Sequence, residues 1–349
     1  MRYIYLTILS IIITLTKIHG QDANFSQYYS APLYLNPALT GLEPNPHFAI
    51  NYRGQWKNFN YPYFIGQASF IHPIYLKANN YLEHKGGVGV SIFNELSGDN
   101  GAFSNYGANF TLSYNLVLDQ TGTQMISFGL QSGYIENRIN ADNLTWGTQY
   151  DPFIGYNPSI TPSVNLVSDR VTYTSFNAGI MYYYQSRKKL YNNSFSSFLG
   201  FATNYLNRPD HSFFETTEPV RVPMLFKLHG GIELKSSDGT MSISPNILIQ
   251  HQQDLTQYDI GSYFTYRILE NMGRQHQDYS LLLGSWFRLQ DSFILSVGFS
   301  SPHYTVGFSF DSNVSTLRYN SQGGGAFEIS INYVISKEKK VRKFSTPLI

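Results

Sequence analysis

The sequence predicts an all-β protein, a transmembrane antiparallel β-barrel of about fourteen strands with an N-terminal periplasmic or lumenal segment. Three observations predict it: a period-two alternation of apolar and polar residues, an aromatic-rich and charge-poor composition, and an export signal. Aromatic residues make up 16% of the chain, and charged residues only 13%. That charged fraction is about half the usual value for a soluble domain, so the surface suits lipid better than water.

The alternation is clear in residues 326–334. Phe327, Ile329, Ile331 and Tyr333 fall on one face of a strand, and Glu328 is among the polar residues on the other. A face this polar does not suit a dry core, whereas a membrane barrel turns its apolar face to lipid and its polar face to the lumen.

The same pattern defines fourteen predicted strands, an even number as expected of a bacterial single-chain barrel. They cover residues 47–56, 63–73, 87–95, 103–117, 124–138, 171–184, 195–206, 222–235, 240–250, 258–268, 279–289, 292–300, 303–311 and 325–335. In 103–117, Phe110, Leu112 and Tyr114 should face lipid and Thr111 the lumen. Residues 74–86 are expected to connect two strands, although they are long for a periplasmic turn.

Connection lengths predict the orientation. The long connections 139–170, 207–221 and 312–324 should be extracellular, and short ones such as 236–239 periplasmic, which leaves both termini periplasmic. Residues 47–335 then form the barrel, which lies in the outer membrane.

The N-terminus is typical of a secretory signal peptide, residues 1–20. Arg2 precedes an apolar stretch from Ile4 to Leu15, too short to span a membrane as a helix, and cleavage is expected near Gln21. The chain has no Cys, which excludes disulfides and thiolate sites.

Two further segments fall outside the predicted wall. Residues 21–46 contain four prolines, which should forbid a regular strand or helix, and we expect this segment to order at the periplasmic mouth or inside the lumen; a disordered leader is the alternative. Residues 336–349 form a basic C-terminal tail, which is usually a solvated terminus.

Enzyme, metal and cofactor sites are not indicated. The histidines are scattered and form no His-Glu-x-x-His pair, so we expect no catalytic residues, no metal and no cofactor. The glycines of 86–89 suit a curved barrel wall better than a phosphate cradle, and Asp311-Ser312-Asn313 suits a loop turn better than a calcium site. With 24 Lys and Arg against 23 Asp and Glu, no nucleic-acid partner is expected.

Two groups of residues are candidates for function. Charged residues expected to face the lumen, where they would suit a polar channel or a plugged barrel, are Arg53, Lys227, Glu233, Arg267 and Glu328, with His229 beside them. Aromatic residues of the longest predicted loop, which could bind a partner, are Trp146, Tyr150, Phe153 and Tyr156. These rings could equally pack over the barrel mouth or rest at the lipid headgroups.

Several motifs carry a family resemblance. Residues 21–29 (QDANFSQYY) and 31–38 (APLYLNPA) resemble the N-terminal signature of the PorP/SprF family, and 51–56 (NYRGQW) and 86–90 (GGVGV) resemble its next two landmarks. Residues 310–317 (FDSNVSTL) and 324–330 (GGAFEIS) are similar to its closing motif. Residues 139–280 carry no matching motif.

The resemblance implies an outer-membrane protein of type IX secretion and gliding motility. Its implied partners are a secreted surface protein, such as an adhesin with a C-terminal targeting domain, and other type IX components, with outer-membrane lipid around the barrel. A passive diffusion channel is the alternative, and an outer-membrane enzyme is a third hypothesis.

Overall fold

The computed structural model describes residues 24–56, 62–78, 81–98, 101–119, 122–141, 144–161, 168–186, 194–214, 218–272, 275–315 and 324–335. The predicted signal peptide and basic tail lie outside these residues. No helix within them is long and apolar enough to cross a membrane.

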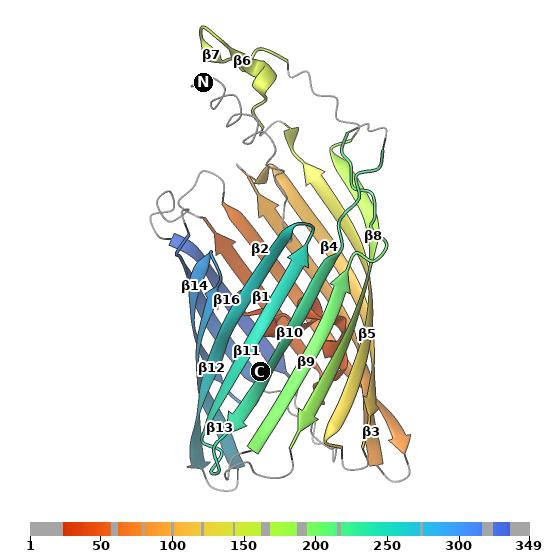
Figure 1. Cartoon of the computed structure of the whole chain (residues 1–349), viewed down its shortest axis with the longest axis vertical. Coiled ribbons are helices and arrows are strands. Elements are labelled where there is room, and N and C mark those ends of the chain that lie inside the picture. The colour runs from red at the N-terminus through yellow and green to blue at the C-terminus, as the bar shows by residue number, and fades with distance from the viewer. Residues whose placement is uncertain are drawn as a thin grey trace, which may run out of the picture.

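The chain forms a closed antiparallel barrel of fourteen strands, as predicted (Figure 1). The strands are β1 (His47–Gln55), β2 (Tyr63–Ala78), β3 (Tyr81–Ser97), β4 (Phe103–Val117), β5 (Gln124–Ile139), β8 (Arg170–Gln185), β9 (Ser194–Asn204), β10 (Leu225–Lys235), β11 (Met241–Gln252), β12 (Leu255–Met272), β13 (Gln275–Arg288), β14 (Ser292–Ser300), β15 (Tyr304–Asn313) and β16 (Gly324–Val334). Each strand pairs with the next along the chain, and β1 pairs with β16 to close the wall.

The two ends of the barrel differ. The connections β5–β8 and β9–β10 lie at one end, which we call the loop end (top of Figure 1), and short connections such as β10–β11 and β14–β15 lie at the other, the turn end. Above the loop end a small hairpin forms from β6 (Tyr150–Asp151) and β7 (Gly155–Tyr156), preceded by the 3-10 turn η5 (Gly147–Gln149).

The facing assignment is confirmed. Phe110, Leu112 and Tyr114 of β4 are about half exposed on the outside of the wall, whereas Thr111 is 0% exposed inside it. The inner faces are polar, yet their side chains are mostly buried, because residues 24–42 fill the lumen.

One predicted connection was wrong. Residues 74–86 are mostly strand, since β2 continues to Ala78 and β3 begins at Tyr81. The register of the β2–β3 pair shifts at a bulge between Ile74 and Tyr75. Gly86, which lies opposite the bulge, has a φ of 150°, a value that glycine tolerates readily.

The proline-rich segment also departs from expectation, because it does form short helices. They are η1 (Tyr28–Ser30), α2 (Pro32–Leu35) and η2 (Pro37–Gly41), and they lie inside the barrel (Figure 1). Pro32 and Pro37 stand in the first turns of α2 and η2, where a missing N–H costs no helical hydrogen bond.

Candidate functional site

Residues 24–42, which we call the plug, lie within the barrel and contact its inner face on nearly every side. Phe25, Tyr28, Leu33 and Leu35 are each 4% exposed or less. Their burial is against wall residues rather than within the segment alone. Tyr29, for example, packs edge-on against Phe198 of β9, with ring centroids 5.7 Å apart.

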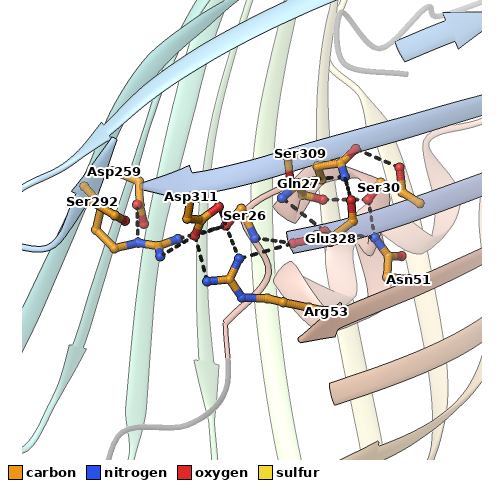
Figure 2. A network of polar contacts seen from close by, with 12 residues as sticks. Ser26, Gln27, Ser30, Asn51, Arg53, Asp259, Ser292, Ser309, Asp311 and Glu328 are labelled. Carbon is orange, nitrogen blue, oxygen red and sulfur yellow. Dashed lines mark hydrogen bonds and ion pairs between the residues drawn. The ribbon is translucent and has the colours of Figure 1, made fainter. Parts of the chain in front are cut away.

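The plug's first residues meet a buried network of charges (Figure 2). Arg53 of β1 donates to Asp311 of β15 at 2.7 Å, and its guanidinium lies 3.8 Å from Glu328 of β16. Ser26 joins the network, because its backbone N–H donates to Glu328 at 2.6 Å and its hydroxyl to Asp311 at 2.8 Å.

A second arginine extends this network across the wall. Arg288 of β13 donates to Asp259 of β12 at 2.8 Å and lies 3.3 Å from Asp311. These two arginines and three carboxylates are each at most 5% exposed, and the excess of one acid is offset by hydrogen bonds from Ser26 and from the Gln27 N–H. Buried charges are tolerated only when they are paired and hydrogen-bonded. The network therefore depends on the plug for some of the hydrogen bonds that its carboxylates need.

Hydrogen bonds with the wall hold the plug further along. Lys227 Nζ donates to the Tyr34 carbonyl at 2.7 Å and lies 4.6 Å from the centre of that ring. Asn36 is buried, with its amide nitrogen 3.0 Å from His229 Nε2. Gln131 donates to the Leu33 carbonyl at 3.1 Å, and the Ser127 hydroxyl to the Ala38 carbonyl at 2.7 Å.

Two glycines let the plug approach the wall closely. Gly129 of β5 and Gly179 of β8 are register partners and form a flat patch on the inner face. A Cβ at Gly129 would overlap the backbone of Pro37, and one at Gly179 would overlap the Asn36 amide. The wall is therefore shaped to the 3-10 turn η2.

The charged residues proposed for the lumen fall into two groups. Arg53, Lys227 and Glu328 are buried and hold the plug, together with His229. Glu233 and Arg267 lie nearer the turn end and are half-buried; the hydroxyl of Ser196 donates to Glu233 at 3.4 Å.

Sequence reasoning missed Ser26, Asp259 and Arg288. It also assigned Asp311 to a loop turn, which was wrong, because Asp311 lies within β15 and pairs with Arg53. The alternation of Phe308, Phe310 and their polar neighbours continues through Asp311 and could have placed it on the inner face.

The aromatic residues of the β5–β8 connection gather at the hairpin β6–β7. Tyr150 and Tyr156 are register partners, and Phe153 at the tip is 95% exposed, so it does not pack over the mouth. Trp146 is half-buried at the start of η5. Gln149 is buried and holds the base of the hairpin. Its side chain donates to the Ile160 carbonyl at 3.1 Å, and its backbone carbonyl accepts from the Asn157 N–H.

No cluster of three or more potential metal ligands occurs among the residues whose side chains the structure describes. Many polar side chains of the inner face bind one another or the plug, as Asn177 does with Gln131 and Ser127 with Ala38.

Comparison with known proteins identifies the family. No curated protein matches the sequence. Among solved structures the barrel is similar to the β-domain of the Bordetella autotransporter BrkA (12% identity, 83% of this chain and 98% of that chain, TM-score 0.41). It is also similar to the CymD monoaromatic hydrocarbon channel (11% identity, 91% and 96%, TM-score 0.44).

The profile described as type IX secretion system membrane protein PorP/SprF matches residues 18–333, nearly the whole chain. The chain therefore belongs to the PorP/SprF family, and it is an outer-membrane β-barrel of the type IX secretion system.

Proposed function

We propose that this protein is a closed, non-enzymatic barrel that binds a secreted surface protein at its loop end, and so helps to export the protein or anchors it at the cell surface. In this proposal the loop end is extracellular. The partner is an adhesin or its C-terminal domain, together with other type IX components.

The plugged lumen is the observation that carries the proposal. A diffusion channel needs a continuous aqueous path, whereas here residues 24–42 bond to strands on opposite sides of the barrel, including β5, β10 and β16. If the lumen is closed to solutes, the surfaces left for binding a partner are the two mouths of the barrel and its loops.

The hairpin β6–β7 supports the position of the partner. It presents Phe153 and Tyr150, 95% and 69% exposed, within residues 144–161, where the Gln149 side chain bonds to the Ile160 carbonyl. Exposed aromatic side chains held by a rigid scaffold are favourable anchors in protein interfaces.

The test compares single-channel conductance in planar bilayers for the intact protein and for a variant lacking residues 24–42. The intact protein should conduct poorly, and the deletion should open a large pore, because a fourteen-strand barrel is too wide for wall side chains alone to fill. A matched control replaces the β5–β8 connection by a Gly-Ser linker, which should leave conductance low.

A large, stable pore in the intact protein would favour the diffusion channel instead. Partner binding is measured separately, by purification from outer membranes of the intact protein and the loop-replaced variant. Loss of a co-purifying surface protein with the loop replacement is the result expected.

A further inference from the structure

We infer that the plug runs along the lumen in one direction, from the loop end to the turn end. The amino terminus of the mature chain therefore emerges at the loop end, on the opposite side of the barrel from the end of β16. The direction of the plug is defined by the two ends of the barrel. Which of these ends lies outside the cell rests on the orientation proposed above.

The first described plug residues lie at the loop end. Phe25 belongs to a buried cluster with Ile65 of β2, and Tyr63 of β2 packs against that cluster. Tyr63 is the register partner of Gln55, the last residue of β1. Ser26 bonds to Asp311, two residues before the end of β15. Both strands end at the β1–β2 and β15–β16 connections, which lie at the loop end.

The last residues before the barrel lie at the turn end. The Tyr75 hydroxyl donates to the Pro44 carbonyl, and Ile335, just past the end of β16, donates its N–H to the Pro46 carbonyl at 2.8 Å. The chain then enters β1 at His47, which pairs with Val334.

Contacts between these points follow the same direction. Along β5, which begins at the turn end, Leu33 contacts Gln131 and Ala38 contacts Ser127, four residues nearer the turn end. Gly41 is reached by Asn115, near the turn end of β4. The plug therefore descends steadily from the loop end to the turn end.

The remaining chain is too short to reverse this. Cleavage near Gln21 would leave three residues ahead of Asn24, which span about 10 Å when fully extended. The nine residues of β1 alone span about 30 Å. The new amino group cannot reach the turn end, which departs from the prediction that both termini share one side.

A partner at the loop end would thus meet the chain's own amino end. The barrel offers two elements there: the hairpin β6–β7 and the start of the plug. A domain fused ahead of Asn24 would be displayed beside the long loops.

Single-cysteine labelling tests this, because the natural chain has no Cys. Asn24→Cys is compared with two exposed markers, Phe153→Cys at the hairpin and Ser237→Cys in the β10–β11 turn. Intact cells are treated with a membrane-impermeant maleimide, and the same cells are treated again after permeabilisation of the outer membrane. Because Asn24 is half-buried, Asn24→Cys should react more slowly than Phe153→Cys, but under the same conditions and with no gain on permeabilisation.

A peptide tag inserted between Gln21 and Asn24 gives a second measurement, read by a protease added to intact cells. Labelling of Asn24→Cys, or cleavage of the tag, only under the conditions that expose Ser237→Cys would overturn the inference.

The two markers test the proposed orientation separately. If Ser237→Cys reacts in intact cells and Phe153→Cys does not, the loop end is not extracellular. The direction of the plug is then still given by which of the two markers Asn24→Cys follows.

Discussion

The two faces of the same wall follow different rules. Leu112 and Thr111 are neighbours in β4, yet Leu112 is 47% exposed among other apolar side chains and Thr111 is 0% exposed beneath the plug, accepting a hydrogen bond from Gln131 at 2.9 Å. The outer face needs only apolar character at each position. The inner face needs particular atoms, because side chains such as Ser127, Gln131 and Lys227 bond to plug residues far away in the chain.

The largest effect is expected from Asp311→Ala. The substitution leaves Arg53 and Arg288 buried with fewer partners, and removing one member of such a network costs about 3–5 kcal/mol of unfolding free energy. Urea unfolding in lipid vesicles measures the loss. Asp169→Ala, the same change at an exposed loop-end position, is the control and should cost less than about 0.5 kcal/mol. Equal losses would show that the network does not stabilise the barrel.

Leu112→Arg tests the outer face. An arginine near mid-membrane on the lipid side should cost about 2–4 kcal/mol and impair insertion, measured as folding yield into bilayers. The alternation alone predicts that Thr111→Arg is tolerated in the lumen, but Thr111 is 0% exposed beneath the plug and has no room for an arginine. Thr111→Arg should therefore be tolerated only in a variant lacking residues 24–42. A full folding yield for Leu112→Arg would contradict the facing assignment.

Gly179→Ala tests the fit of the inner face to η2. The added methyl would collide with the Asn36 amide, and overpacking of this kind costs about 1–3 kcal/mol. Gly147→Ala, where no atom lies within 4 Å of the added carbon, is the control. Thermal unfolding and single-channel conductance are measured together. A loosened plug should raise the conductance of Gly179→Ala alone, and unchanged conductance in both variants would argue against close seating of η2.

The smallest effect on stability is expected at the hairpin, which belongs to neither face. Replacing Tyr150 and Phe153 by Ala should change unfolding free energy by less than about 0.5 kcal/mol, because both rings are exposed. Surface labelling of the partner in cells should nonetheless fall sharply. Undiminished labelling would remove this hairpin as the docking site.

These differences explain what sequence alone could predict. All fourteen strands were found because outward alternation is a local signal, visible in runs such as Phe110, Leu112 and Tyr114. The ends of β2 and β3 were missed because Pro73 and Gly86 resemble strand breaks, while the paired strand opposite each of them continues.

The plug contacts were beyond reach for a different reason. Ser26 bonds to residues 285 and 302 positions away, and no local pattern specifies such a pair. The period-two alternation places Arg53, Lys227 and Glu328 on the inner face of the barrel. It does not say whether these side chains line a water-filled channel or bind the plug. The short helices could not be predicted from proline content, because proline disfavours a helix interior but is tolerated in the first turn, where Pro32 and Pro37 stand.

The seam between β1 and β16 has a consequence for biogenesis. Arg53 and Glu328 are register partners across it, and Ser26 and Gln27, from the segment that precedes β1, donate to Glu328. The last strand to be synthesised therefore supplies both the closing edge of the wall and an acceptor for Ser26 and Gln27 of the plug. A chain truncated before β16 would have an open edge and would lose the Glu328 contacts of its plug at once, so a protease that surveys unfinished barrels would find both defects in the same molecule.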